Sequence, residues 1–259
     1  MNNFYDKMAK EFGGYGFSTS KPKYHSRYPN GNPEAIFKEK LLELATPDSI
    51  AADMGCGDGK FTFEIADHFF RISGLDSSKE LIAIAQQKKK TLNVKNVSLF
   101  FGDASKTSFD DQSFDIIFNR RGPSYYTEYS RLLKPGGYYL EIGIGEQDAV
   151  SIKKIFGRGQ NYGVWNSSRL EADKPKFEAL GMELIVLKDY IYSENYLSKE
   201  DFILFLKGVP IFEDFNLDKD KKYLDAYFKN NIEGVEVRLA RHRVVYVLKK
   251  QLFGQRGGS

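Results

Sequence analysis

The chain has 259 residues, of which 41% are hydrophobic and 28% charged, values that are ordinary for a globular protein with a buried core. Its net charge of +3 is too close to neutral to indicate a nucleic-acid or membrane partner by itself, and its single cysteine excludes intramolecular disulfides and any cysteine-rich zinc module. The N-terminus lacks a basic segment followed by an apolar core, and no apolar run reaches about 18 residues, so we expect a cytoplasmic protein without a membrane span.

Residues 1–35 carry aromatic side chains among glycines and polar residues, without a clean period of 2 or 3.6. The rings that stand out are Tyr5, Phe12, Tyr15, Phe17, Tyr24 and Tyr28. Such a segment is too aromatic for a disordered tail and too irregular for a long helix. We interpret it as an N-terminal cap, whose rings either cover a ligand or simply pack on the core.

A helical pattern follows, from Pro33 to Ala45, because proline favours the first helical turn and apolar residues then recur on one broad face. The most informative stretch comes next, at Ile50 to Phe61, IAADMGCGDGKF. A short apolar strand ends at Asp53, three glycines give a turn without side-chain bulk, and Phe61 opens another helical pattern. This combination predicts a nucleotide-binding turn.

Two residues, Lys60 and Asp53, indicate which kind of nucleotide this turn binds. The dinucleotide pattern G-x-G-x-x-G is not met, because Lys60 occupies the position of its last glycine. A carboxylate at Asp53 roughly 5 Å from a phosphate would cost about 3 kcal/mol per pair of unit charges at an effective dielectric near 20. The same carboxylate would stabilise an ammonium or sulfonium, so adenosine with a cationic amino-acid tail fits better.

Strand and helix patterns alternate beyond the turn, which predicts a parallel sheet with right-handed crossovers. Helices are expected at 61–70 and 78–90, and strands at 71–76, just before Gly102, at 114–119, and after the turn at Pro135, Gly136 and Gly137. A helix and a glycine-rich loop are expected in 145–165, a further helix and strand in 169–194, and a last strand at 239–250.

The order of these motifs resembles that of class I S-adenosylmethionine-dependent methyltransferases. The resemblance covers about residues 45–145: the glycine turn, RISGLD with Asp76 at its end, SLFFGDAS, FDIIFN, and the Pro-Gly-Gly turn within LLKPGGYYLEIGI. It implies a Rossmann-like, doubly wound α/β fold with a seven-stranded, mostly parallel sheet. It also implies S-adenosyl-L-methionine as the cofactor.

The resemblance also implies roles for individual residues. Asp76 would accept hydrogen bonds from both ribose hydroxyls, which suits a carboxylate with two acceptor oxygens. Asp103 would accept the adenine amine, and the backbone N–H of Ala104 would donate to the ring. Cys56 is interpreted as a small residue of the turn. The expected cofactor-binding residues are Asp53, Gly55, Cys56, Gly57, Gly59, Asp76, Ser77, Asp103, Ala104 and Asn119.

On this template the chain divides into a core with additions. Residues 36–197 and 232–252 form the methyltransferase core, 1–35 the cap and 253–259 a tail. Residues 198–231 contain two amphipathic helical stretches where the family joins its last two strands closely. We expect them to form a helical lid, inserted before the last strand, over the acceptor side.

The acceptor is expected beside the end of the fourth strand, where the chain reads Phe118-Asn119-Arg120-Arg121-Gly122-Pro123-Ser124-Tyr125-Tyr126. The Asn/Asp-Pro-Pro-Tyr/Phe motif of amino-group methyltransferases is absent apart from Asn119. Paired arginines near a cationic cofactor are costly unless an anion offsets them. Either they bind a carboxylate or phosphate of an acidic acceptor, or they pair with acidic residues such as Glu141, Glu146 or Asp148.

Methyl transfer needs alignment and desolvation more than a special side chain, so a catalytic residue need not exist. The candidates are His25, as a general base in the cap, and the two arginines; the expected substrate-binding residues are Tyr24, Arg120, Arg121, Tyr125 and Glu146. His68 is expected to be structural and His242 to take part in surface pairing. No metal-ligand motif is present in the sequence.

The leading hypothesis is a methyltransferase for a small-molecule acceptor, with an acidic acceptor suggested by the arginines. An RNA base methyltransferase is the first alternative, although no zinc module, basic arm or appended RNA-binding domain is found. A non-catalytic protein that binds S-adenosylmethionine is the second. The sequence leaves the oligomeric state open.

Overall fold

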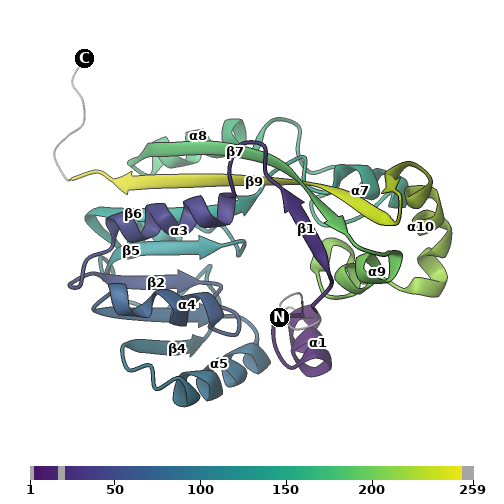
Figure 1. Cartoon of the computed structure of the whole chain (residues 1–259). Helices are drawn as coiled ribbons and strands as arrows, with labels where there is room; N and C mark the ends of the chain where they lie inside the picture. Colours follow the sequence, from purple (N-terminus) through teal and green to yellow (C-terminus); the bar gives the residue numbers. More distant parts are fainter. Residues whose placement is uncertain (1–2, 17–20, 253–259) are drawn as a thin grey trace.

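The computed structural model describes residues 3–16 and 21–252, and its centre is one twisted sheet flanked by helices (Figure 1). The strand order is β1-β7-β9-β6-β5-β2-β3-β4, with β8 paired to β9. The strands are β1 (Tyr24–Arg27), β2 (Ile50–Met54), β3 (Arg71–Asp76), β4 (Val97–Phe101), β5 (Phe114–Arg120), β6 (Leu133–Ile144), β7 (Met182–Tyr196), β8 (Ile232–Glu233) and β9 (Glu236–Lys250).

The pairings confirm the predicted doubly wound, mostly parallel sheet. Strands β2 to β6 pair in parallel, and β9 runs antiparallel between β6 and β7. The predicted count of seven strands was too low, because β1 and β8 are additional. Both are short strands that pair with the ends of β7 and β9, each of which has 15 residues and extends past the core of the sheet.

Helices cover both faces of the sheet. They are α3 (Pro33–Leu44), α4 (Lys60–Ile65), α5 (Lys79–Thr91), α6 (Tyr126–Leu132), α7 (Val150–Phe156) and α8 (Arg169–Ala179), with a 3-10 turn η1 (Ala66–His68) after α4. A hydrophobic core lies on each face of the sheet, and the side chains of β5 alternate between the two. Ile116 and Phe118 pack in the cluster with α3, whereas Ile117 packs in the cluster with α6. The α-helix expected at 61–70 is shorter than predicted, because it ends at Ile65 and continues as the 3-10 turn η1.

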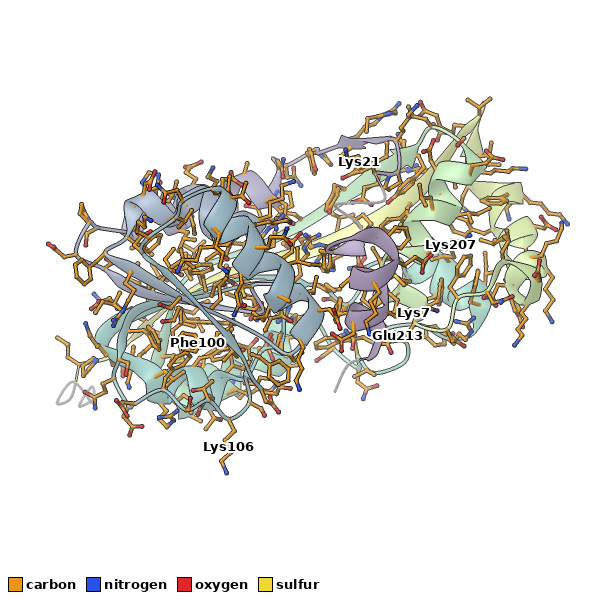
Figure 2. All side chains as sticks on the ribbon, turned by 90° about the horizontal axis from the view of Figure 1, so that it is seen from below. Lys7, Lys21, Phe100, Lys106, Lys207 and Glu213 are labelled. Carbon is orange, nitrogen blue, oxygen red and sulfur yellow. The ribbon has the colours of Figure 1, made fainter. Side chains whose placement is uncertain are left out.

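Three further helices stand beyond the carboxyl ends of the parallel strands (Figure 1): α1 (Asn3–Phe12), α9 (Lys199–Lys207) and α10 (Leu217–Asn231). The last two belong to the predicted insertion and surround a third core cluster with Phe202, Tyr227 and Leu239, together with the 3-10 turn η2 (Pro210–Phe212). Figures 1 and 2 both show α1 between α5 and α9. Within 3–16 and 21–252, no helix is long and apolar enough to cross a membrane.

The N-terminal segment is more regular than the sequence suggested, since it holds both α1 and β1. Asp6 accepts a hydrogen bond from Ser78 Oγ at 2.5 Å, and Lys10 lies 3.4 Å from Glu80, so α1 is attached to the start of α5. Phe4 and Met8 are buried beneath it. The predicted tail, 253–259, lies outside the described residues.

Candidate cofactor and acceptor site

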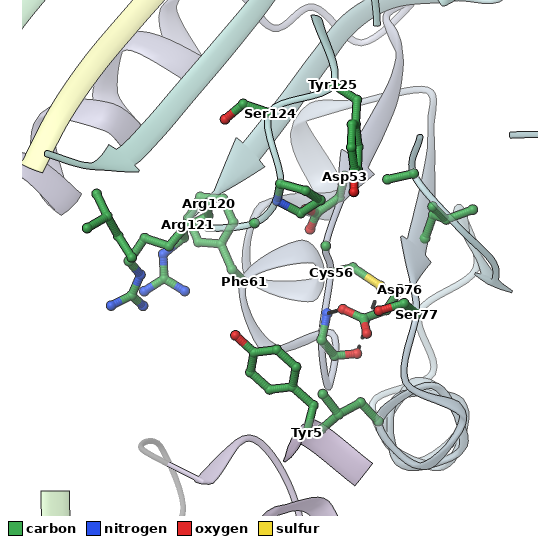
Figure 3. A pocket seen from close by; sticks show the side chains of 18 of the residues that line it. Tyr5, Asp53, Cys56, Phe61, Asp76, Ser77, Arg120, Arg121, Ser124 and Tyr125 are labelled. Atoms are coloured by element: carbon green, nitrogen blue, oxygen red, sulfur yellow. Dashed lines mark hydrogen bonds between the residues drawn. The ribbon is translucent and has the colours of Figure 1, made fainter. Parts of the chain in front are cut away.

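A cavity of about 900 Å³ opens at the carboxyl ends of β2, β3 and β5 and is bounded on the far side by α1. This edge is the general ligand crevice of doubly wound sheets. The volume falls in the upper part of the range that small-molecule sites occupy. Figure 3 shows the glycine turn, Asp76, the two arginines and Tyr5 around it.

The glycine turn forms one wall. Gly55 has a φ of +100°, a conformation that favours glycine, and its N–H donates to the carbonyl of Leu75 at 2.8 Å. Gly57, with a φ of +56°, donates its N–H to Asp76 Oδ2 at 2.8 Å. The turn is thus tied to the next strand, and its backbone faces the cavity.

Of two further turn residues, Gly59 is placed differently from the prediction and Cys56 is placed as predicted. Gly59 does not line the cavity; it precedes α4 with a φ of +76°, and a Cβ there would lie 2.6 Å from the Phe63 ring. Gly59 is therefore required by helix packing. Cys56 lines the cavity but is buried, and burial raises the pKa of its thiol well above the ordinary value, as expected of a small structural residue rather than a nucleophile.

Asp76 both organises the wall and presents acceptors to the cavity. Its Oδ2 accepts from Gly57 N, and its Oδ1 accepts from Ser78 N at 2.9 Å. Burial raises the pKa of this carboxyl, against the lowering effect of these backbone donors. Because a carboxylate has about four acceptor positions, these backbone donors still leave acceptor capacity for a ligand hydroxyl.

Asp53 lies deeper at the end of β2. It is 3% exposed and accepts a hydrogen bond from Thr62 Oγ1 at 2.6 Å. Burial raises its pKa to about 7, although Thr62 and Arg120 act in the opposite direction. A buried carboxyl that is half protonated near neutral pH would become a stronger acid beside a cationic ligand.

This pKa predicts a pH dependence of S-adenosylmethionine binding. As pH falls through about 7, free Asp53 takes up a proton and no longer attracts the cation, so affinity is lost toward low pH. We expect the dissociation constant to be about tenfold higher at pH 6 than at pH 8. Calorimetry at both values checks this, with Asp53→Asn as the control whose weaker binding does not change between them. Equal affinities of the native chain at both pH values would contradict the assignment.

Asp103 and Ala104 line the cavity as expected, with Asp103 exposed at its rim. Asp103 Oδ1 accepts from Ser105 N at 2.8 Å, and this bond lowers the pKa of the carboxyl. Asn119, by contrast, does not line the cavity. Its buried side chain accepts from Gly122 N at 2.6 Å and donates to the carbonyl of Pro123, so it shapes the loop after β5.

Arg120 and Arg121 both line the cavity and both pair with an acidic residue, but not with the three that the sequence suggested. Their common partner is Glu34 at the start of α3: Arg120 Nε lies 2.7 Å and Arg121 Nε 3.5 Å from its carboxylate. Burial raises the pKa of Glu34, but Arg121 and Arg120 more than offset this and hold it at about 2. Arg121 also has a φ of +62°, which is strained for a residue with a side chain.

The proposed partners of the arginines bind other residues. Glu141 pairs with Arg169, and Asp148 lies 2.9 Å from Arg241. Glu146 accepts from Arg169 N at 3.2 Å and does not line the cavity.

The cap residues Tyr24 and His25 also lie away from the cavity. Both belong to β1: the Tyr24 ring packs on Tyr196, with centroids 5.3 Å apart, and His25 Nε2 lies 3.6 Å from Glu236. Tyr125 does line the cavity and is 41% exposed. The surface role predicted for His242 is wrong, since it is 2% exposed and its Nδ1 accepts from Gln147 N.

Sequence reasoning missed a buried polar network on the wall beyond β5. Arg169 of α8 pairs with Glu141 of β6 and, at 3.2 Å, with Asp173. Tyr126 Oη donates to Asp173 at 2.8 Å, and Ser124 Oγ donates to Glu141 at 2.8 Å. Four of these side chains line the cavity, those of Ser124, Tyr126, Arg169 and Asp173.

Further lining residues that were not among the predicted site residues include Tyr5, Tyr15, Gln160, Asn161 and Trp165. Only the aromatic content of 1–35 signalled any of them. Among the described residues, no group of three or more His, Cys, Asp or Glu side chains could hold a metal ion.

Comparison with known proteins agrees with this geometry. A family model described as a methyltransferase domain matches residues 51–137. The demethylmenaquinone methyltransferase of Bacillus licheniformis is 30% identical over 152 residues, which cover 52% of this chain and 65% of that relative. The chain spans about half the length of other relatives with the same name.

Solved structures show the same fold at low identity. The YcgJ protein of Bacillus subtilis matches with a TM-score of 0.62 and 18% identity, over 84% of this chain and 99% of that one. Geranyl diphosphate C-methyltransferase from Streptomyces coelicolor matches with a TM-score of 0.56 and 16% identity, over 96% and 99%. Residues 51–137 thus match a methyltransferase domain, and the chain has the fold of these solved structures.

Proposed function

We propose that the protein transfers a methyl group from S-adenosyl-L-methionine to a small-molecule acceptor. The observation that carries the proposal is the carboxylate of Asp76, which is held by Gly57 N and Ser78 N with both oxygens at the wall of the cavity. A vicinal diol matches that arrangement. Asp53 and the exposed Asp103 add negative charge where a cationic amino-acid tail and an adenine amine would lie.

The cofactor would supply an electrophilic methyl group for an in-line displacement. The chain itself would bind, orient and exclude water. Tyr5, Tyr15 and Trp165 line the cavity, so an acceptor would be held among aromatic rings. Ser124 and Tyr126 are fixed by Glu141 and Asp173 and would orient a polar acceptor group.

We also propose an indirect role for the 198–231 insertion as a lid. Among the described residues, its side chains do not line the cavity. It supports the 157–165 loop, which does: Gln160 N donates to the carbonyl of Ile211 at 2.8 Å, and Arg158 lies 2.9 Å from Asp220. Movement of the insertion would therefore open or close the cavity through Gln160, Asn161 and Trp165.

Two measurements test the function. Calorimetry with S-adenosylmethionine and S-adenosylhomocysteine should give micromolar binding, and methyl-labelled cofactor should label an acceptor. Because several relatives are named for demethylmenaquinone, we would begin with a short-chain demethylmenaquinol and then screen small acids. A folded chain that binds neither compound would refute the proposal. Binding without transfer to any acceptor would favour the non-catalytic alternative.

A further inference from the structure

The cavity wall at the end of β5 carries more positive than negative charge. Arg120 and Arg121 share one carboxylate, that of Glu34, and Figure 3 shows the two guanidinium groups side by side. One carboxylate cannot neutralise two guanidinium groups. All three side chains are partly exposed, at 34%, 24% and 28%.

The residues packed behind this wall do not neutralise the excess positive charge of Arg120 and Arg121. Arg241, Arg243 and Lys153 are at most 6% exposed, and the acidic groups that face them are Asp148 and Glu194. These buried residues interact electrostatically with those of the wall: Arg243 acts on Glu34, and Arg241 acts on Arg121. Within the described part of the chain, Arg243 Nε has no hydrogen-bond partner.

The whole cluster therefore holds five cationic groups (Arg120, Arg121, Arg241, Arg243 and Lys153) against three carboxylates (Glu34, Asp148 and Glu194). Asp53 also interacts with Arg120, but burial raises its pKa to about 7, and even with its full charge the cations remain in excess. Burial lowers the pKa of Lys153, which moderates the excess but leaves the four guanidinium groups charged. Buried charge without a partner is costly, so a cluster of this kind favours an additional anion. Its exposed members, Arg120 and Arg121, face the cavity.

The opposite half of the same cavity is acidic. Asp53, Asp76 and Asp103 stand at the ends of β2, β3 and β4, and they suit a cationic ligand. The cavity is thus divided into an acidic half and a basic half. Two ligands of opposite charge would each find a complementary wall.

We propose that Arg120 and Arg121 bind an anionic group, a carboxylate or a phosphate, of the methyl acceptor. The inference rests on the proposed function, because it takes the acidic half as the place of the cofactor. Arginine suits this task since its planar fork binds either anion in two places. Glu34 holds the two guanidinium groups together and competes with the incoming anion for them.

The test measures anion binding rather than turnover. Inorganic pyrophosphate and benzoate are titrated calorimetrically into the full chain saturated with S-adenosylhomocysteine. We expect at least one to bind, and the stronger of the two identifies phosphate or carboxylate as the source. Arg120→Gln and Arg121→Gln should each weaken that binding about tenfold or more, the loss expected for one charged hydrogen bond.

Glu34→Gln gives a change of opposite sign, because it removes the competing carboxylate: anion binding should tighten several-fold. This variant decides the question if an arginine variant fails to fold. Arg131→Gln, whose partners Glu128 and Asp111 lie away from the cavity, is the matched control and should bind the anion unchanged. Absence of binding by both probes, or binding that the arginine and Glu34 variants leave unchanged, would overturn the inference. Failure to bind S-adenosylhomocysteine would instead refute the proposed function.

Discussion

Replacing Asp76 by asparagine is expected to weaken the binding of S-adenosylmethionine by at least about a hundredfold. A carboxylate that accepts from both ribose hydroxyls makes two charged hydrogen bonds, each worth about 1.5–3 kcal/mol, and the amide keeps only one acceptor oxygen. The substitution also acts on the wall itself. Asp76 accepts from both Gly57 N and Ser78 N, and an amide can satisfy only one of them as an acceptor.

Calorimetry on the native and variant chains measures this effect, with circular dichroism to show that the variant is folded. Asp110→Asn is the matched control, because Asp110 is an exposed carboxylate that does not line the cavity. Its affinity for the cofactor should be unchanged. A folded Asp76→Asn chain that binds within threefold of the native one would show that this carboxylate does not hold the ribose.

The cofactor half of the site was predictable from sequence because its residues are arranged by local turns and by sheet topology. The carboxyl ends of parallel strands meet at one edge, so residues at the ends of β2, β3 and β4 must lie near one another. Asp53, Asp76 and Asp103 stand at or just after those ends and line one cavity. Gly59 shows the limit of the motif: a glycine is needed there for a positive φ and for packing against Phe63, and it does not line the cavity.

The acceptor half was much less predictable because its contacts join distant parts of the chain. Glu34 and Arg120 are 86 positions apart, and nothing in either local pattern indicates the pairing. The position of His242 depends on the close approach of β9 to the loop after β6, where Gly145 leaves room for the imidazole. The extra strand β1 likewise forms because β9 occupies only one edge of β7, and the other edge is left open for pairing.

Removal of Arg169 is expected to destabilise the fold strongly. Its guanidinium lies between Glu141 and Asp173, and the three side chains are 7%, 1% and 5% exposed. Removal of one partner of a buried ion pair typically costs 3–5 kcal/mol, because the charge left behind stays away from water. Arg169→Met preserves much of the side-chain volume but leaves Glu141 without a cation and Asp173 with only the exposed Lys176, 2.8 Å away. For a chain of this size we expect the melting temperature to fall by roughly 10 °C.

Arg131→Met is the matched control for this stability prediction. Arg131 also pairs with two acidic residues, but its side chain is 33% exposed and that of Asp111 is 71% exposed. Pairs of this kind contribute about 0–1 kcal/mol, so the melting temperature should fall by only a few degrees. Adding Glu141→Gln to Arg169→Met removes the carboxylate charge that was left without a cation and should restore part of the lost stability. Equal melting temperatures for the two arginine variants would mean that the Arg169 network does not stabilise the cavity wall. The hydroxyls of Ser124 and Tyr126, which belong to that network, could then not orient an acceptor in the way we propose.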